Sequence, residues 1–428
     1  MQRPYPLLVF GNFVNELMVT VPVHRHADAL VAVSPRKVWL TQPGDVLVTP
    51  RAMSEPLRDY ACDLLGFSAT DVTFLHAPTD GLATLTEAVR RNGLVDRLRS
   101  EAQQRPGIRF QAFAQDRPAI ELAAEIGVPV EGYPVEGVPA TAVAAAYRIN
   151  TKPGFRELAG KLGIRVPHGF SCGTPAELAA ALRDVLTDKG AAVTKLARGS
   201  NGYGVAFWEA GDLPDLDAKL AAYLLSVADQ PPGWVVEERL DFVRIVTVEM
   251  EVDENGPRVM HVGEMRTPNG SFSGQITPLV ASTSAVKELV EGGLALGRHL
   301  HQVGYWGPFD VDGGITADDV LYSTESNLRK TGCTYLDLLV KRLLGEERAA
   351  DAVWIADSRV GGVEREFAAG VARVRQAGLS FETGSDEGVV ITSDTLAFDG
   401  KWRYLILGKS HRRVEELESG LVDALKLS

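Results

Sequence analysis

The chain has 428 residues, of which 45% are hydrophobic and 23% are charged. This length exceeds one ordinary hydrophobic core and the composition is that of a globular protein, so we expect about two or three folded domains rather than a disordered chain. The net charge of −12 argues against a nucleic-acid partner, because phosphate backbones are bound by clustered Lys and Arg and the sequence has no basic stripe.

The cysteines and the apolar runs predict a cytoplasmic protein. Cys62, Cys172 and Cys333 are far apart and lack metal-ligand spacing, so we expect reduced thiols. The apolar run at 6–10 is too short for a signal peptide, and no other run approaches the length of a membrane span. We therefore expect no membrane partner.

The first 144 residues are predicted to form an α/β domain, because short apolar strands alternate with helical segments. A stretch rich in Pro and Gly, 132–142, is predicted to join this domain to the next. The predicted strands are 6–10, two short runs within 38–50, 71–78 and 108–115, and the predicted helices are 82–103 and 119–129.

Residues 145–344 are predicted to form an α+β unit, because its strands and helices do not alternate regularly. A helix near Pro153 is expected to end at Gly163. Strands on both sides of a glycine-rich turn lie within 191–209. The other predicted elements are helices 175–186 and 286–304, strands 234–240, 247–252 and 259–265, and a hairpin of 307–313 with 320–328.

Residues 345–428 are predicted to form a small appended α+β unit. A helix (362–376) precedes a two-stranded hairpin (389–408), whose turn is predicted at Asp399-Gly400. The last helix carries an apolar stripe of Val414, Leu417, Leu421 and Leu425.

The segment YSTESNLRKTG, 322–332, places polar side chains at every second position. In a strand, Glu325, Asn327 and Arg329 leave one face, because the side-chain period is two. The preceding strand offers Asp310 and Asp312. Carboxylate and amide oxygens converging from a hairpin suit Mg²⁺, whereas the alternative is a solvated hairpin edge with ordinary surface acids.

A second candidate site is the glycine-rich turn that follows Lys195. Its glycines leave backbone N–H groups free to approach a phosphate. Strands on both sides make it a flap and not a P-loop or dinucleotide fingerprint, which lead into a helix. A hairpin turn without a ligand is the alternative. The turn contains Gly199, Ser200, Asn201, Gly202 and Gly204.

Lys152 is a third candidate, at the start of a predicted helix. Its side chain could reach a bound phosphate, and the alternative is a solvated lysine.

The order of these motifs along the chain resembles that of the ATP-grasp carboxylate–amine ligases. The motifs are, in chain order, Lys152, Lys195 with GSNGYGV, VVEERL, GPFDVD and ESNLR. The pattern Gly-x₄-Asp followed by Glu-x-Asn-x-Arg carries most of this resemblance. VFGNFVNEL and SPRKVWLTQPGDVLVTP look like the domain that precedes ATP-grasp units in bacterial peptide ligases. GVVITSDTLAFDGKWRYLILGKS is similar to the tail of the pheganomycin-type peptide ligases.

The resemblance implies a fold of both α/β and α+β type. It comprises a pre-ATP-grasp α/β domain (1–144), a central ATP-grasp fold of two α+β subdomains (145–344) and a small C-terminal α+β unit (345–428). It also implies that ATP and Mg²⁺ are cofactors. The oligomeric state stays open, with a homodimer as one alternative.

The resemblance further implies roles for individual residues. Lys152 and Lys195 would bind ATP phosphates under the flap. The Glu237 carboxylate would face the adenine amine, and the backbone of Glu238 and Leu240 would pair with the ring edge. The metal positions would be Asp312, Glu325 and Asn327, with Asp310 as an alternative or shared ligand because relatives often have a cationic or small residue there.

The reaction implied is activation of a carboxylate as an acyl phosphate, followed by attack of an amine. Arg329 is the first choice for the cation that stabilises the oxyanion, and Arg266 the second, although a surface arginine at a strand end explains Arg266 equally well. In the subgroup, an unusual guanidino-bearing amino acid is joined to the amino end of a peptide in antibiotic biosynthesis. A small-molecule kinase and a non-catalytic nucleotide-binding protein are the alternatives.

Overall fold

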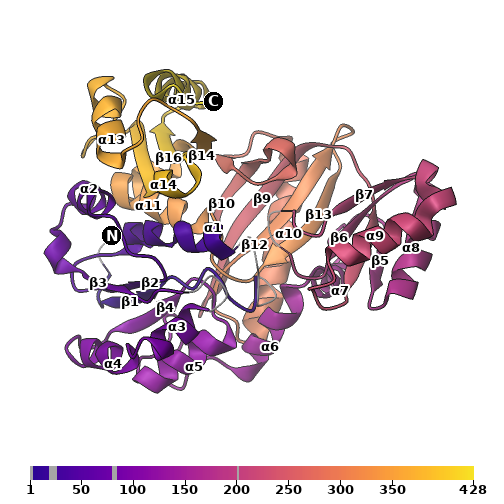
Figure 1. Cartoon of the computed structure of the whole chain (residues 1–428), viewed down its shortest axis with the longest axis horizontal. Coiled ribbons are helices and arrows are strands. Elements are labelled where there is room, and N and C mark those ends of the chain that lie inside the picture. The colour runs from indigo at the N-terminus through magenta and orange to yellow at the C-terminus, as the bar shows by residue number, and fades with distance from the viewer. Residues whose placement is uncertain (1–2, 19–26, 80–83, 200–201) are drawn as a thin grey trace.

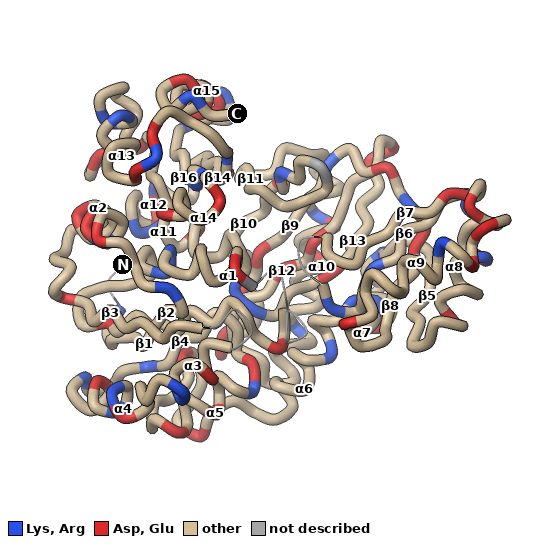
Figure 2. The backbone as a smooth tube through the Cα atoms, in the orientation of Figure 1, with Lys and Arg blue, Asp and Glu red and all other residues tan. Residues whose placement is uncertain are grey.

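The computed structural model describes residues 3–18, 27–79, 84–199 and 202–428. The N-terminal part, the region with strands β5–β8 and the C-terminal part surround a central group of strands (Figure 1). None of the helices in the described ranges is both long and apolar enough to cross a bilayer. Positions of both charge signs are interspersed in every part of the chain (Figure 2).

The N-terminal domain has a four-stranded parallel sheet in the order β3-β2-β1-β4, which confirms the predicted α/β class. The helix predicted at 82–103 is split in two, because Gly93 has a φ of 66° that a helix cannot include. The strands are β1 (Leu7–Phe10), β2 (Val46–Thr49), β3 (Thr73–His76) and β4 (Arg109–Ala112), and the helices are α1 (Ala27–Ala32), α2 (Glu55–Leu65), α3 (Leu85–Arg91), α4 (Val95–Gln103) and α5 (Arg117–Ile126).

The first apolar run of 38–50 differs from the prediction. It belongs to a 3₁₀ helix, η1 (Ser34–Leu40), with Pro35 in its first turn, and only the second run is a strand. Trp39 of this helix is 1% exposed, and its Nε1 donates to the Thr392 carbonyl at 2.8 Å. Contacts with the C-terminal part therefore decide the conformation of this segment. A second short 3₁₀ turn is η2 (Ala69–Asp71).

A four-stranded antiparallel sheet in the order β5-β8-β6-β7 forms the first half of the central region. The predicted strand–turn–strand of 191–209 is confirmed as β6 and β7. The strands are β5 (Gly169–Cys172), β6 (Ala191–Leu196), β7 (Ala206–Glu209) and β8 (Trp234–Glu238), and the associated helices are α6 (Ala140–Ile149), α7 (Lys152–Leu162), α8 (Pro175–Lys189), η3 (Ala210–Asp215) and α9 (Leu216–Ser226).

An eight-stranded sheet joins the rest of the central region to the C-terminal part, in the order β13-β12-β9-β10-β11-β14-β16-β15. The C-terminal strands are therefore not a separate layer, because β11 pairs with β14. The domain boundaries at 144 and 344 remain proposals. The strands are β9 (Phe242–Asp253), β10 (Gly256–Arg266), β11 (Gly274–Thr277), β12 (Gly307–Thr316), β13 (Leu321–Asn327), β14 (Val353–Val360), β15 (Gly388–Asp394) and β16 (Lys401–Gly408).

Helices cover this sheet and complete the core. The apolar stripe predicted for the last helix is confirmed, because Val414, Leu417, Leu421 and Leu425 are all buried. The predicted turn at Asp399-Gly400 includes a short helix. The helices are η4 (Pro268–Gly270), α10 (Thr283–Gln302), α11 (Thr334–Leu344), α12 (Glu346–Ala350), α13 (Phe367–Gln376), α14 (Leu396–Asp399) and α15 (His411–Leu425).

Candidate functional site

Three neighbouring strands place their acidic side chains on one face of the large sheet. Strand β12 pairs antiparallel with β13 and β9, so Asp310 and Asp312 each lie opposite a polar residue on both neighbouring strands. The hairpin predicted from the sequence is therefore confirmed. Across β13, β12 and β9 the two polar rows are Asn327–Asp310–Glu249 and Glu325–Asp312–Thr247.

Alternation along β9 explains why these side chains share a face. Val246, Val248 and Met250 are buried in the core on the α10 side of the sheet. Thr247 and Glu249 consequently leave the opposite face. The same strand thus supplies a hydrophobic face to the core and a polar face to the site.

Asp310 and Asn327 form the most tightly bonded pair of this face. The Asp310 Oδ1 accepts from the Asn327 backbone N at 2.7 Å, and both carboxylate oxygens lie 3.0 Å from Asn327 Nδ2. Burial and the nearby Glu249 raise the pKa of Asp310. Its oxygens are therefore already occupied by donors, which favours Asp312 over Asp310 as a metal ligand.

Asp312 lies opposite Glu325 and is less heavily bonded. Its Oδ2 accepts from Asn327 Nδ2 at 3.4 Å. Burial, Asp310 and Glu325 all raise the pKa of Asp312. Packing several carboxylates on one buried face is unfavourable unless a proton or a cation compensates their charge.

Glu249 lies on the same face but was not among the site residues predicted from the sequence. Its carboxylate accepts from the Thr331 hydroxyl at 2.9 Å and also from the Thr334 hydroxyl. Burial raises its pKa to about 8, despite these hydrogen bonds. The polar–apolar alternation of VTVEMEV was the available signal, but it does not say which strand β9 adjoins.

Lys152 is ion-paired with the acidic face of the sheet, which is formed by Glu249, Asp310, Asp312 and Glu325. Its Nζ lies 2.8 Å from Glu325 Oε2 and 3.5 Å from the Gly199 carbonyl. Burial acts to raise the pKa of Glu325, but the attraction of Lys152 outweighs it and the pKa is lowered. Helix α7 positions this lysine, because the Thr151 side chain caps the helix and Lys152 is its first residue.

Lys195 and Glu237 form a second ion pair, next to Arg156. The Lys195 Nζ lies 2.7 Å from Glu237 Oε2, and Arg156 Nη1 lies 2.9 Å from Glu237 Oε1. Glu237, predicted to face adenine, is 3% exposed and has both oxygens engaged by cations. Of the two residues whose backbone was predicted to pair with adenine, Glu238 donates its N–H to the His168 carbonyl at 2.8 Å, and Leu240 follows the end of β8. Glu237 is therefore held between Lys195 and Arg156.

The glycine-rich flap connects β6 and β7 above the acidic face. Ser200 and Asn201, which were predicted to contact ATP, lie outside the described residues. Gly202 and Gly204 have φ values of 76° and 72°, which L side chains rarely adopt. Gly199 and Gly202 line the same cavity as the carboxylates.

The two arginines proposed for catalysis have different surroundings. Arg329 lines the cavity, its Nη2 donates to Asn327 Oδ1 at 2.7 Å, and its Nε is buried without a partner among the described residues. Arg266 Nη1 instead lies 2.9 Å from Asp357 and 2.5 Å from Glu418. Burial opposes its charge, but these acids raise the pKa of Arg266. The second arginine is thus held in an ion-pair network between β10, β14 and α15.

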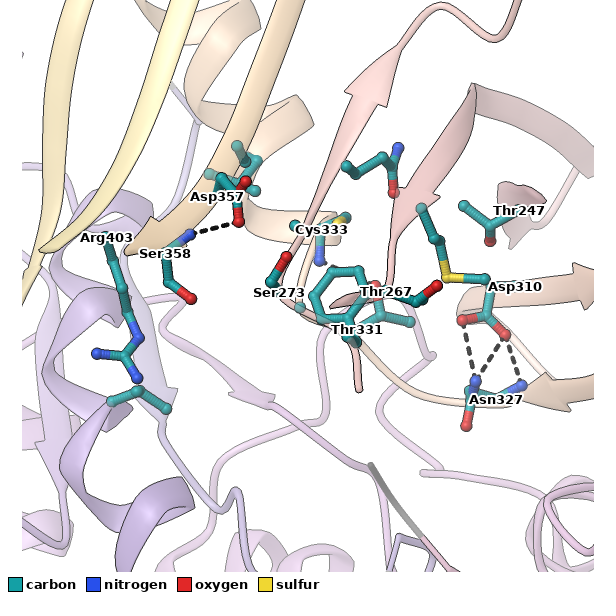
Figure 3. A pocket seen from close by; sticks show the side chains of 18 of the residues that line it. Thr247, Thr267, Ser273, Asp310, Asn327, Thr331, Cys333, Asp357, Ser358 and Arg403 are labelled. Atoms are coloured by element: carbon teal, nitrogen blue, oxygen red, sulfur yellow. Dashed lines mark hydrogen bonds between the residues drawn. The ribbon is translucent and has the colours of Figure 1, made fainter. Parts of the chain in front are cut away.

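A cavity of about 500 Å³ is lined by part of this set, namely Gly199, Gly202, Glu249, Asp310, Asp312, Glu325, Asn327 and Arg329. Lys152, Lys195, Glu237 and Arg266 do not line it. Figure 3 shows Asp310 and Asn327 at one side and Ser358 and Arg403 at the other, with Thr331 between them. The polar face of the sheet therefore opens on a space large enough for a small-molecule ligand.

The donor set fits a hard cation only in part. Asp312, Glu325 and Asn327 offer the oxygen ligands that Mg²⁺ prefers. Among the residues that the structure describes, however, no three His, Cys, Asp or Glu side chains lie at a common metal-binding spacing. Asn327 is not one of these four residue types, and the Glu325 carboxylate is paired with Lys152.

Comparison with known proteins supports the architecture. Residues 34–128 match the Pre ATP-grasp domain family, and residues 369–421 match the PGM1 C-terminal domain family. Each match covers less than half of the chain. No curated protein matches the sequence.

Solved structures match along the whole chain. An N5-carboxyaminoimidazole ribonucleotide synthetase in complex with ADP is 12% identical, with a TM-score of 0.60, over 100% of this chain and 99% of its own. The chain adopts the ATP-grasp fold. Biotin carboxylase from Campylobacter jejuni is also 12% identical, with a TM-score of 0.62 and coverage of 99% and 92%. An L-amino acid ligase from Bacillus licheniformis is 15% identical, with a TM-score of 0.55 and coverage of 99% and 98%.

Proposed function

We propose that this protein is an ATP-dependent, ADP-forming ligase that activates a carboxylate as an acyl phosphate and joins it to an amine. The observation that carries the proposal is the shared cavity. The flap, the acidic face of β12 and β13, and Arg329 all border it, and Lys152 bonds to both the flap and the acidic face. Structures of the same fold are named as complexes with ADP, with ATP and with MgADP, which supports a nucleotide as the ligand.

The two lysines are proposed to hold the phosphates of ATP. Each is now neutralised by a glutamate, Lys152 by Glu325 and Lys195 by Glu237. Phosphate oxygens can replace Glu325 at Lys152, whereas the more deeply buried Glu237 keeps Lys195 in place. Gly202 and Gly204 let the flap backbone approach the phosphates closely.

Asp312, Glu325 and Asn327 are proposed to hold Mg²⁺, and Asp310 to orient Asn327. A bound Mg²⁺ would neutralise charge on the phosphates. Release of Lys152 from Glu325 frees the carboxylate that the metal needs. One exchange of partners thus prepares both the phosphate site and the metal site.

Arg329 is proposed to face the acyl and phosphoryl oxygens. Its Nε has no partner among the described residues, so it can donate to an oxygen that develops negative charge. A carboxylate is a poor electrophile until phosphorylated, and the closed flap would exclude water from the acyl phosphate before an amine attacks it. Arg266 has no free donor role in this scheme, because two acids hold it.

In finer detail, we propose peptide ligation in antibiotic biosynthesis, with an unusual guanidino or amino acid as the donor and the amino group of a peptide as the acceptor. This rests on the resemblance of the motifs and termini to pheganomycin-type ligases, and a cytoplasmic location goes with it. A homodimer is a further proposal, since one structure of the same fold is named as a biotin carboxylase domain dimer.

The test is to incubate the protein with ATP, Mg²⁺ and panels of carboxylates and amines, following ADP release and product mass. A new amide formed together with ADP and phosphate is the expected result. A stable phosphorylated substrate would indicate a kinase instead. Nucleotide binding without turnover of any pair would favour a non-catalytic protein.

A further inference from the structure

The N-terminal domain contributes to the cavity a guanidinium that has no acidic partner within the described part of the chain. Arg36 lies on η1, and its guanidinium carbon is 5.2 Å from the ring centroid of Phe13 and 4.9 Å from that of Tyr335. Among the described residues it forms no ion pair, and its buried Nε has no hydrogen-bond partner. Its environment is therefore an aromatic slot that opens into the cavity.

The acids that line this part of the cavity are engaged elsewhere. Asp399 is paired with Arg403 at 2.6 Å, and Asp357 is paired with Arg266 at 2.9 Å. Glu249 accepts hydrogen bonds from two threonines. These three acids are thus engaged by other groups, and none of the described acids forms an ion pair with Arg36.

A half-buried cation without a counter-ion loses part of its hydration, and ring faces compensate only part of that cost. Burial lowers the pKa of Arg36, and the neighbouring cation Arg403 lowers it further, although Tyr335 acts in the opposite direction. Such a site is stabilised when an anion enters. Lys152, a proposed phosphate ligand, is paired with Glu325 on β13, and neither Lys152 nor Lys195 lines the cavity beside Arg36, so we do not expect the nucleotide to supply this anion.

We propose that Arg36 binds a carboxylate of the substrate other than the one that is activated. The planar fork of a guanidinium matches a carboxylate in two parallel hydrogen bonds. Figure 3 shows Arg403 across the cavity from Asp310 and Asn327, with Thr331 and Cys333 between. A substrate can therefore react at the acidic face while its second carboxylate is held at the far wall.

This inference rests on the proposed function and names a class of substrate for it. The carboxylate can belong to the acceptor, as the free end of an amino acid or peptide, or to a donor with two carboxylates. Both sources present the same group to Arg36. The two sources can be distinguished by replacing the carboxylate with a carboxamide. This change weakens binding of the acceptor in the first case and of the donor in the second.

The experiment is calorimetry on the full chain saturated with MgADP, using two matched pairs of probes. Glycylglycine and glycylglycinamide represent the acceptor, and succinate and succinamate represent the donor. We expect the carboxylate member of one pair to bind about tenfold or more tightly than its amide. Arg36→Gln should bring this ratio close to one, and Arg36→Lys should give an intermediate ratio because lysine lacks the fork.

The matched control is Arg298→Gln, which removes an exposed arginine on α10 and should leave the ratio unchanged. A ratio near one for both pairs in the parent protein overturns the inference. So does a ratio that survives Arg36→Gln, or no binding of any probe at its highest soluble concentration.

Two further measurements distinguish a structural role of Arg36 from the proposed role in substrate binding. Removing an uncompensated cation should not lower the melting temperature, and MgADP affinity of Arg36→Gln should equal that of the parent. If Arg36→Gln does not fold, the role is structural, unless Arg36→Lys folds and shows the intermediate ratio. Failure of the parent to bind MgADP counts against the proposed function, whereas normal MgADP binding with unchanged probe ratios counts against this subsite alone.

Discussion

Replacing Glu325 by glutamine should change ADP affinity in opposite directions with and without Mg²⁺. Glu325 Oε2 lies 2.8 Å from Lys152 Nζ, so its carboxylate competes with a phosphate for this ammonium group. The Glu325 side chain is 34% exposed, and such a screened pair is worth about 0.5–1 kcal/mol. Without Mg²⁺, Glu325→Gln should therefore tighten ADP binding by about two- to fivefold.

With Mg²⁺ the same substitution removes an anionic metal ligand. The gain in ADP affinity that Mg²⁺ provides should fall by about tenfold or more, since losing even an outer partner of a metal ligand has effects of this size. Ligation of any productive substrate pair should be abolished. No compensation is expected from Asp310, because Asn327 occupies both of its oxygens.

The assay is calorimetric titration of ADP in EDTA and in Mg²⁺, with Glu347→Gln on the exposed surface of α12 as the control. The crossing of the two effects distinguishes this prediction from a general loss of structure, which would weaken binding in both buffers. If Glu325→Gln leaves the ADP affinity in EDTA unchanged and does not reduce the gain in affinity that Mg²⁺ provides, then the proposed exchange of Lys152 from Glu325 to phosphate is refuted. Substantial Mg²⁺-dependent turnover in the variant would refute the metal assignment.

Four further predictions concern the Lys195–Glu237 pair, the flap and the buried acid Glu249. Glu237→Gln should lower the free energy of unfolding, measured by urea titration, by about 3 kcal/mol, because two cations lose their shared carboxylate. Lys195→Ala should weaken ATP binding by about tenfold, and an unchanged affinity in calorimetry would contradict the proposed phosphate role of Lys195. Gly204→Ala forces a side chain to adopt a φ of 72° and should lower the melting temperature, whereas Gly211→Ala, where a Cβ meets open space, should not. The pKa of Glu249 is about 8 in the folded protein in place of 4.5, so the folded state binds this proton more tightly than the unfolded state does. The protonated Glu249 therefore contributes its full stabilisation below about pH 4.5, and this stabilisation is lost as the pH rises to about 8. In metal-free buffer, Glu249→Gln should therefore gain melting temperature relative to the parent between about pH 6 and pH 9, and a constant difference would show that Glu249 is ionised throughout.

Local sequence patterns were sufficient for much of the fold. The alternation in 307–313 and 320–328 predicted the hairpin of β12 and β13, and Gly163 correctly marked the end of α7. Two segments were not predictable in this way. The helix 82–103 breaks where Gly93 adopts a positive φ, and the run at 38–40 is helical because Trp39 packs against the C-terminal part.

The sequence by itself determined which chemical groups are present and which of them share a strand face, because side-chain alternation is a property of the local backbone. It therefore placed Glu325 with Asn327 and Asp310 with Asp312. Strand order and ion pairing depend on residues far apart in the chain, and only the tertiary structure decided them. The large sheet brought Glu249 to the acidic face and paired Arg266 with Glu418. Arg36 of the N-terminal domain faces the cavity without a counter-ion among the described residues, because burial and charge compensation are settled only when distant segments pack together.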